Sequence, residues 1–339
     1  MHHRSLGGSA GPASVPAPGS RHSGQAGNGQ RVRHSPVAAC HRLASRLQAV
    51  AQVLPVWHAV TVLTKSAVRQ LGESERPEVE RLLAADPYVA AQVHERVLAR
   101  GLGWWRSDGR LFGYGARGRL ESLCWLGTQL TPIAADPEAL DAFAETLARF
   151  GRTCTSIVGR RDQVLELWDR MGNRWGRARD VRASQPLLVA QKPAPLAADP
   201  GVRLIRPEEV DVLFPASVAM YTEEVGVSPL DGGRGYRHRV ADLVRSGRAY
   251  AKVVDGRVIF KADLAVITPH TAQVQGVWVD PQWRGKGIAT AGMAAVVNDA
   301  LRRVAPTVSL YVNDYNLPAR AAYKHCGFEQ VAELATVLF

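Results

Sequence analysis

Short apolar runs and helical stretches follow one another in a regular order through residues 202–339. Pro207 opens a helical stretch whose first turn carries Glu208, Glu209 and Asp211, as the positive end of a helix dipole prefers. The pattern predicts strands over 202–206, 248–255, 258–267, 272–279, 307–313 and 331–339, and further helices over 287–304 and 318–325. The predicted order is βαα-βββ-α-β-α-β.

An earlier block, residues 59–191, shows nearly the same order. It predicts strands over 60–64, 110–114, 120–126, 153–158 and 186–191, and helices over 76–85, 88–100, 138–150 and 162–171. We therefore expect two copies of one α/β (α+β) fold in tandem, each a mixed sheet flanked by helices.

The segments outside these two blocks have a different composition. Residues 1–36 hold 17 Gly, Pro or Ser and no Phe, Trp or Tyr, too little apolar area to offset the chain entropy of folding. Residues 192–201 contain three prolines among small residues, which predicts a semi-extended linker. The expected organisation is a disordered basic tail (1–58), a first domain (59–191), a linker (192–201) and a second domain (202–339).

The net charge of +11 belongs largely to the tail. Residues 1–60 carry six arginines and no lysine or acidic residue, so the other 279 residues carry only +5. Nucleic-acid binding through a basic face is therefore disfavoured as the main function. Hydrophobic residues at 46% and charged residues at 22% indicate a globular protein.

Compartment and membrane association follow from what the sequence lacks. No run of about 18 uncharged apolar residues occurs, so we expect no membrane span. The nearest candidate for a secretory signal, 47–63, is interrupted by Gln48, Gln52, Pro55 and His58. Four scattered cysteines without a C-x-x-C pair disfavour a zinc ribbon and fit a reducing compartment, so we expect a cytoplasmic protein without a metal.

The most specific pattern lies between the predicted strand 272–279 and the following helix. Gln282, Gly285 and Gly287 form a Q-x-x-G-x-G turn, with Arg284 and Lys286 between them. Backbone N–H groups at a helix start lack intrahelical partners, and glycines let the backbone approach a phosphate closely. The turn therefore predicts a site for a pyrophosphate carried on a long molecule.

A second pattern follows about 30 residues later, with Asn316, Ala319, Tyr323, Gly327 and Phe328. Ala319 and Tyr323 are four residues apart and share a helix face, and Gly327 falls where a helix favours a left-handed residue at its end. The two patterns in this order resemble the GNAT superfamily of acetyl-CoA-dependent N-acetyltransferases. The segments 221–229, 260–263, 273–280 and 309–314 further resemble an actinobacterial group with an uncharacterised GNAT-like domain in front of the catalytic one.

The resemblance implies acetyl-CoA as cosubstrate and direct attack by a primary amine in a ternary complex. It implies that strands 273–279 and 307–313 splay apart around the pantetheine arm, and that backbone N–H groups near Val277 to Val279 face the thioester oxygen. The cofactor-binding residues it implies are Val277, Trp278, Val279, Gln282, Arg284, Gly285, Lys286, Gly287, Ile288, Ala289 and Asn316. Tyr323 matches the general acid, whose ordinary pKa near 10 is close to that of a thiol.

The general base stays open. Many GNAT enzymes place a carboxylate on the strand before the pyrophosphate loop, but here that strand offers only Gln273 and Gln275. The remaining carboxylates are Glu223 and Glu224, which follow the first helix, and Asp263, which shares a strand face with Lys261 and could pair with it. A water chain to a backbone carbonyl would need none of them.

The earlier block lacks a comparable loop. After its strand 120–126, residues 127–137 contain one glycine, two prolines and no basic residue, and Asp136 and Glu138 occupy the start of the next helix. We expect this block to have the fold without the cofactor and to shape or cover the substrate cleft of the later block.

Two weaker patterns are interpreted structurally. Residues 113–118 match G-x-G-x-x-G, but a strand follows them rather than a helix, so we expect a hairpin turn. Neighbours on a helix point apart, so His325 and Cys326 are not expected to form a nucleophile pair, and Cys326 is expected to be a buried small apolar side chain.

The sequence thus predicts an acyltransferase that acts on an amine: a small molecule, a protein N-terminus or a lysine. The alternative is an acyl-CoA-binding sensor without turnover, which the absence of a carboxylate on the strand would suit. A nucleic-acid-associated protein acting through its tail is a weaker third hypothesis. The acceptor and the acyl-chain preference stay open, and a homodimer is compatible with the sequence.

Overall fold

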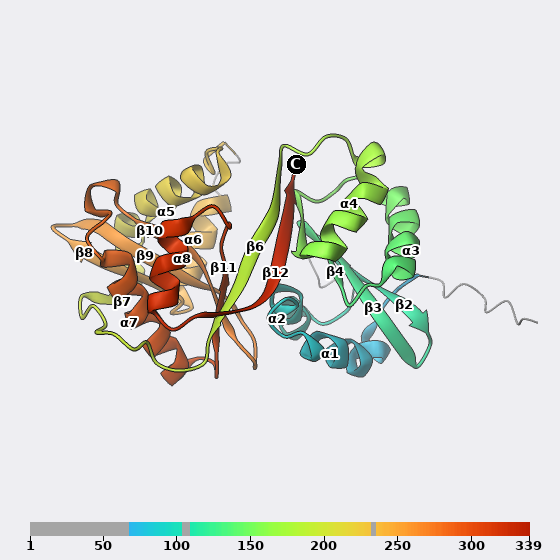
Figure 1. Cartoon of the computed structure of the whole chain (residues 1–339), viewed down its shortest axis with the longest axis horizontal. Coiled ribbons are helices and arrows are strands. Elements are labelled where there is room, and N and C mark those ends of the chain that lie inside the picture. Colours follow the sequence, from blue (N-terminus) through green and yellow to red (C-terminus); the bar gives the residue numbers. More distant parts are fainter. Residues whose placement is uncertain (1–67, 104–108, 232–234) are drawn as a thin grey trace, which may run out of the picture. The chain divides into compact units, whose positions relative to one another are not determined.

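The computed structural model describes residues 68–103, 109–231 and 235–339 (Figure 1). The predicted tail (1–58) and the predicted strand 60–64 lie outside these residues. The described residues belong to one compact unit, 60–339.

The earlier half begins with β1 (Arg69–Gln70) and ends with β6 (Asp180–Ala190). The elements between them are the 3₁₀ turn η1 (Glu73–Glu75), α1 (Arg76–Ala85), α2 (Ala91–Arg100), β2 (Arg110–Ala116), β3 (Arg119–Leu126), β4 (Gln129–Ile133), α3 (Pro137–Leu147), η2 (Ala148–Phe150), β5 (Ser156–Arg160) and α4 (Arg161–Trp175).

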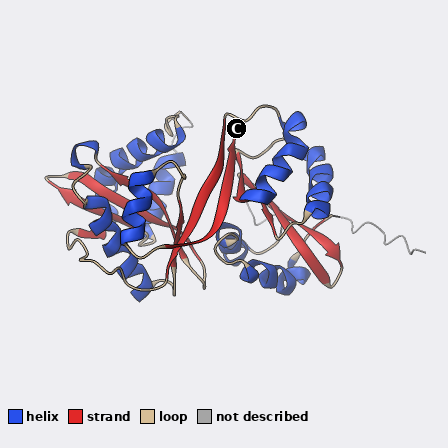
Figure 2. Cartoon of the chain, in the orientation of Figure 1, coloured by secondary structure: helices blue, strands red, loops and turns tan. Residues whose placement is uncertain are grey.

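The later half runs from β7 (Val202–Leu204) to β12 (Glu329–Leu338). Between them lie η3 (Pro207–Glu209), α5 (Val210–Val225), α6 (Gly235–Arg245), β8 (Ala249–Val254), β9 (Arg257–Ile267), β10 (Ala272–Val279), η4 (Pro281–Trp283), α7 (Ile288–Arg303), β11 (Val308–Tyr311) and α8 (Leu317–His325). The predicted mixed α/β fold with helices against the sheet is confirmed (Figure 2).

The twelve strands of the described residues form one mixed sheet, in which the two halves exchange their last strands. The order is β1-β2-β3-β4-β5-β12-β6-β11-β10-β9-β8-β7. Strand β12, from the end of the chain, pairs with β5 of the earlier half. Strand β6 pairs with β11 of the later half (Figure 1). The two exchanged strands also pair with each other.

The hydrophobic cores follow this exchange. Ala335 and Val337 of β12 are fully buried in the core of the earlier half, among the side chains of α3 and α4. Leu188 and Ala190 of β6 are buried in the core of the later half, beside α7 and α8. Each half therefore depends on the other for a strand, and a cut at 192–201 would leave both cores incomplete.

Replacing Val337 by Asp should destabilise the earlier half, although Val337 lies near the C-terminal end of the chain. A carboxylate in this core is expected to lower the free energy of unfolding by about 3 kcal/mol or more, measured by urea denaturation. Amide hydrogen exchange should accelerate in α3 and α4. Val331→Asp on the same strand is the control, because Val331 is 45% exposed. Faster exchange confined to α7 and α8 would contradict the exchange of strands.

The linker is fastened to the later half. Asp199 accepts a hydrogen bond from Lys252 Nζ at 2.7 Å, and its backbone N–H donates to Ala291 O. The backbone N–H of Ala194 donates to Asn298 Oδ1 at 2.8 Å. Residues 192–201 therefore run along β8 and α7 as a fixed connection.

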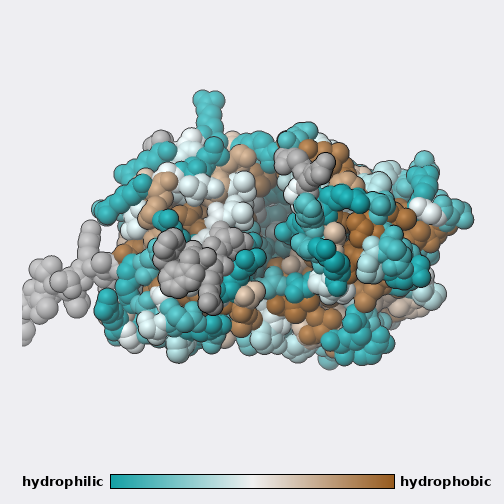
Figure 3. Space-filling model, turned by 180° about the vertical axis from the view of Figure 1, so that it is seen from behind, coloured by the Kyte–Doolittle hydropathy of each residue, from teal (hydrophilic) through white to brown (hydrophobic). Residues whose placement is uncertain are grey.

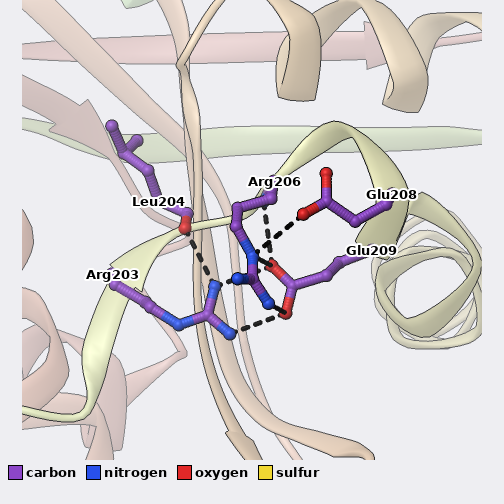
Figure 4. Close-up of polar contacts among 5 residues, drawn as sticks. All are labelled: Arg203, Leu204, Arg206, Glu208 and Glu209. Carbon is purple, nitrogen blue, oxygen red and sulfur yellow. Dashed lines mark hydrogen bonds and ion pairs between the residues drawn. The ribbon is translucent and has the colours of Figure 1, made fainter.

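The entry into α5 is held by an ionic cluster, shown in Figure 4. Arg203 binds both carboxylate oxygens of Glu209, at 2.8 and 2.7 Å, and Arg206 contacts both Glu208 and Glu209. The hydrogen bonds from Arg203 and then Arg206 hold the pKa of Glu209 well below its usual range. This cluster joins β7 to the first turn that leads into α5.

Among its described residues, the earlier half has two strands that were not predicted, β1 and β4. Residues 129–133, expected within a loop, form β4, which pairs with β3 and with β5. The strand 120–126 therefore corresponds to β9 and not to the strand before the cofactor loop. Pro132 concealed this strand, because proline donates no ladder hydrogen bond and normally argues against an interior strand.

Candidate functional site

The site begins where β10 and β11 part. These parallel strands pair only through Ala272 with Val308 and Gln273 with Ser309. Beyond Gln273, β10 stays paired with β9 while β11 pairs with β6. The opening predicted between these strands is therefore present.

A β-bulge lies on β10 at the opening. The register shifts between Gln275 and Trp278, so a single residue of β9, Ala262, faces both Gly276 and Val277. Gly276 has φ +61°, in the left-handed region that favours glycine. The extra residue changes which side chains face α7. Before the bulge they are those of residues 272 and 274, and after it those of residues 277 and 279.

The turn after β10 forms a cradle of backbone donors. Asp280 caps η4 by accepting from the N–H of Gln282 at 2.9 Å. Gly285 and Gly287 both have φ +75°, and Gly287 caps α7 without a side-chain hydrogen bond. Within the described chain, no hydrogen bond is made by the N–H groups of residues 285–289. These exposed donors at a helix start suit an anion such as a pyrophosphate.

The two cations of this turn are held by neighbours. Arg284 donates to Val279 O at 3.0 Å and forms an ion pair with Glu223 at 2.6 Å. Lys286 Nζ lies 4.8 Å from the centre of the Trp283 ring. Both side chains are exposed, so either can turn toward a phosphate by giving up a weak surface contact.

Helix α8 carries the second pattern. Asn316 caps it by accepting from the N–H of Ala319 at 3.2 Å, and its side-chain amide nitrogen makes no hydrogen bond in the described residues. Gly327 has φ +85°, as predicted for the helix end. Tyr323 packs edge-on against Phe328, with ring centres 5.9 Å apart.

Tyr323 connects the two patterns. It is only 7% exposed and lies in the hydrophobic cluster that also holds Val277, Val279 and Ile288. In the described part of the chain its hydroxyl makes no hydrogen bond. Burial, followed by the nearby charge of Glu224, raises the pKa of Tyr323 above its usual value of 10, so the phenol keeps its proton at neutral pH.

The three candidate carboxylates differ in their surroundings. Both oxygens of Glu223 are bound, one to Trp278 Nε1 at 3.1 Å and the other to Arg284. Asp263 Oδ2 binds Lys261 Nζ at 2.6 Å, which is the ion pair that their shared strand face suggested. Glu224 is exposed, and no side chain of the described residues bonds to its carboxylate.

Sequence reasoning missed a contribution from the earlier half. Gln92 on α2 accepts from Gln129 at 2.5 Å and donates to Gln273 Oε1 at 3.4 Å, and Gln275 donates to the same oxygen at 3.2 Å. Burial raises the pKa of the nearby Tyr311 at the end of β11. The polar residues of β10 therefore meet α2, which no local pattern could indicate.

The weaker patterns have the expected structures. Residues 113–118 join β2 to β3 in a hairpin, and Cys326 is fully buried, with its Sγ 3.2 Å from Thr290 O. Burial raises the pKa of Cys326 to about 11. In the earlier half, Asp136 Oδ1 accepts from the N–H of Ala139 at 2.8 Å and so occupies the start of α3.

Two further findings concern the described residues alone. They contain no group of three His, Cys, Asp or Glu side chains that could hold a metal ion. None of their helices is long and apolar enough to cross a membrane. The face seen in Figure 3 is largely hydrophilic, with separate hydrophobic areas and a hollow near its centre.

Comparisons with solved structures show the fold. A GNAT-family acetyltransferase from Colwellia psychrerythraea has a TM-score of 0.50 at 12% identity, covering 80% of this chain and 99% of its own. A Drosophila protein has a TM-score of 0.59 at 14% identity, covering 81% and 99%. A tandem GNAT protein from the clavulanic acid biosynthesis pathway has a TM-score of 0.47 at 15% identity, covering 80% of this chain and 98% of its own.

Family models match two parts of the sequence, while no curated protein matches it. A model of a domain of unknown function (DUF4081) matches residues 109–213, which include β2 to β7 and the linker. The model of the acetyltransferase (GNAT) family matches residues 229–328, which include the bulge, the cradle and Tyr323. The chain is thus an acyltransferase whose later half contains an acetyltransferase domain of the GNAT family, with a DUF4081 domain in front of it.

Proposed function

We propose that the protein transfers an acetyl group from acetyl-CoA to a primary amine, by direct attack in a ternary complex. The observation that carries this proposal is the meeting of three features at the β10–β11 opening. They are the unpaired N–H groups of residues 285–289, the bulge at Gly276, and Tyr323 packed in one cluster with Val277 and Val279. No observation favours the alternative of a sensor without turnover.

The cradle would bind the pyrophosphate of acetyl-CoA. Its N–H groups and the positive end of the α7 dipole point to one anion, and Gln282, Arg284 and Lys286 add polar or charged side chains beside it. Ile288 and Ala289 supply the first helical N–H groups. The free amide nitrogen of Asn316 is available to a carbonyl of the pantetheine arm, and the strand edge from Val277 through Trp278 to Val279 would align that arm.

Tyr323 would protonate the departing thiolate. Its phenol is kept protonated by burial and lies against the strand that would hold the thioester. Transfer of a proton from a phenol to an alkyl thiolate is close to thermoneutral when their pKa values are similar. The raised pKa of Tyr323 ensures that the donor is present throughout the physiological range.

Glu224 is the carboxylate best suited to take a proton from the attacking amine. Glu223 and Asp263 each have an oxygen committed to a cation, whereas the carboxylate of Glu224 is unbonded within the described chain. Glu224 lies in the last turn of α5, where its backbone oxygen accepts from Arg182 of β6, the strand that pairs with β11, and its charge adds to the raised pKa of Tyr323. A carboxylate there would also attract a cationic amine.

Replacing Glu224 by Gln should therefore lower kcat by about 10²-fold or more while leaving acetyl-CoA affinity unchanged. Glu223→Gln is the matched control on the adjacent position. It can still accept from Trp278 Nε1 and loses only the exposed ion pair with Arg284, so its kcat should stay within about fivefold of the wild type. Equal losses in the two variants would reject Glu224 as the base.

The function itself is tested by thiol release from acetyl-CoA. The probe is a mixture of small primary amines, amino acids and short peptides with free N-termini or lysines, followed by mass spectrometry for a gain of one acetyl group. We expect release above the rate of hydrolysis without amines. Acetyl-CoA binding without any amine-dependent release would contradict the proposal.

We propose a division of labour between the two halves. In the earlier half, the Asp136 carboxylate occupies the helix start that would otherwise take a pyrophosphate, while Gln92 reaches the acceptor side of β10. The earlier half would therefore shape the acceptor site without binding the cofactor. The cytoplasm remains the proposed compartment, and the three described cysteines are all free.

A further inference from the structure

Lys261 is a charged residue inside the sheet. It lies on β9 between the buried Phe260 and Ala262, and none of its surface is exposed. Its ammonium donates to Asp263 Oδ2 at 2.6 Å and to the backbone oxygen of Gly276 at 3.0 Å. The ion pair thus touches the bulge directly.

Gly276 is tightly packed on the side that faces the Lys261–Asp263 ion pair. A Cβ atom at Gly276 would lie 3.1 Å from Lys261 Nζ, 3.1 Å from Asp263 Oδ2 and 3.0 Å from Met220 Cε on α5. The bulge backbone therefore rests on the ion pair without an intervening side chain or space for water. A change in either charged residue would be transmitted to the Gly276 carbonyl.

Stability does not explain this pair. Taking an ammonium and a carboxylate out of water carries a large desolvation penalty, and apolar residues of similar volume are often at least as stable. The Oδ1 atom of Asp263 is buried and has no hydrogen-bond partner among the described residues, which adds to that penalty. A costly ion pair that bonds to the bulge of β10 therefore points to a role other than stability.

The geometry of the peptide unit supplies the role. The C=O of Gly276 and the N–H of Val277 belong to one planar trans peptide, so they point in opposite directions. By holding the carbonyl, Lys261 directs the Val277 N–H away from the ion pair. A cation on the carbonyl oxygen also polarises the amide and strengthens its N–H as a donor.

We propose that Lys261 is a positioning residue, which aims and polarises the Val277 N–H toward the thioester oxygen, and that Asp263 is its counter-ion and not the general base. The inference rests on the proposed function, since it needs an acetyl thioester in the β10–β11 opening. An N–H set in advance toward the developing oxyanion stabilises the transition state more than the bound substrate.

The test compares two variants. Lys261→Met with Asp263→Asn removes the ammonium and leaves no uncompensated charge, and it should lower kcat by about 10- to 100-fold, somewhat less than the loss of a whole oxyanion donor. Asp263→Asn alone leaves the buried Lys261 without its counter-ion, which lowers stability, but its amine, charged or neutral, still donates to the Gly276 carbonyl, so kcat of the folded variant should fall by only about threefold. Both are measured with the amine mixture above, and KM for acetyl-CoA should hardly change.

The matched control is a second Lys–Asp pair in the same half. Lys252 and Asp199 bond at 2.7 Å on the linker side of β8, and Lys252→Met with Asp199→Asn should leave kcat unchanged. A loss of kcat in this control equal to that of the Lys261 double variant would assign the effect to general destabilisation and overturn the proposal.

A spectroscopic readout reports on the N–H itself. Infrared difference spectra of acetyl-CoA labelled with ¹³C at the thioester carbonyl should show a lower stretching frequency when it is bound to the wild type than in solution. The Lys261 double variant should lose part of that shift. An unshifted carbonyl in the wild type would overturn the proposal even if the double variant fails to fold.

The outcomes separate this inference from the proposed function. If the wild type neither binds acetyl-CoA nor releases thiol, the proposed function fails first. If the wild type is active and the double variant keeps its kcat, only the inference fails. If Asp263→Asn loses as much as the double variant, Asp263 acts on its own and the role assigned to Lys261 is wrong.

Discussion

Replacing Gly287 by Glu should abolish acetyl-CoA binding in calorimetry while the protein stays folded. Apart from its chain neighbours, no atom of the described residues lies within 4 Å of a Cβ built at Gly287, so the new side chain extends into open space. Its carboxylate would accept hydrogen bonds from the N–H groups at the start of α7 and would repel a pyrophosphate. We expect an affinity loss of about 100-fold or more.

Two controls separate charge from backbone strain. Gly287→Ala adds a Cβ at the same φ of +75° without a charge, and it should weaken binding far less. Gly176→Glu introduces the same side chain at a glycine with φ +82° and open surroundings at the end of α4, and it should leave binding unchanged. Unaltered affinity of the Gly287→Glu variant would reject the cradle as the cofactor site.

The same titration counts the sites. The wild type should bind one acetyl-CoA per chain, because Asp136 fills the corresponding helix start in the earlier half. A stoichiometry of two, with one site surviving in Gly287→Glu, would show that the earlier half binds the cofactor as well. The full chain is needed for this measurement, since each half is completed by a strand of the other.

Replacing Tyr323 by Phe should lower kcat by about 10²- to 10⁴-fold if protonation of the thiolate limits turnover. The ring packing against Phe328 is retained, so melting temperature and acetyl-CoA affinity should not change. Because burial raises the pKa of Tyr323, the proton is held well past pH 10, and the wild-type rate should show no fall from phenol ionisation below that pH.

Tyr250→Phe is the control in the same hydrophobic cluster. Its hydroxyl donates to Asp299 at 2.8 Å, so its loss should lower the free energy of unfolding by about 1 kcal/mol without changing kcat. A fall of less than threefold for Tyr323→Phe would demote this residue to a packing role.

The choice among the carboxylates illustrates what tertiary structure adds. In the sequence, Glu223, Glu224 and Asp263 are equivalent candidates, because an acid–base role depends on neighbours and not on residue type alone. The fold brings Arg284 and Trp278 to Glu223 and leaves the carboxylate of Glu224 unbonded within the described residues. These partners are separated along the chain by more than 50 positions.

The amino-acid sequence by itself determined the cradle and the α8 pattern, because both are short contiguous segments. The positive φ of Gly285 and Gly287, the capping by Asn316 and the left-handed Gly327 are properties of the local backbone. The mixed α/β fold followed from strand and helix periodicity for the same reason.

Only the tertiary structure decided which strands are neighbours. The pairing of β12 with β5 and of β6 with β11 joins residues more than 100 positions apart, and apolar strands carry no local label for their partner. The bulge at Gly276 was equally hidden, since an extra residue appears only against the register of β9. The contact of Lys261 with the Gly276 carbonyl depends on that register. The sequence therefore indicated that Lys261 and Asp263 share a strand face, but not that Lys261 bonds to the backbone of the bulge.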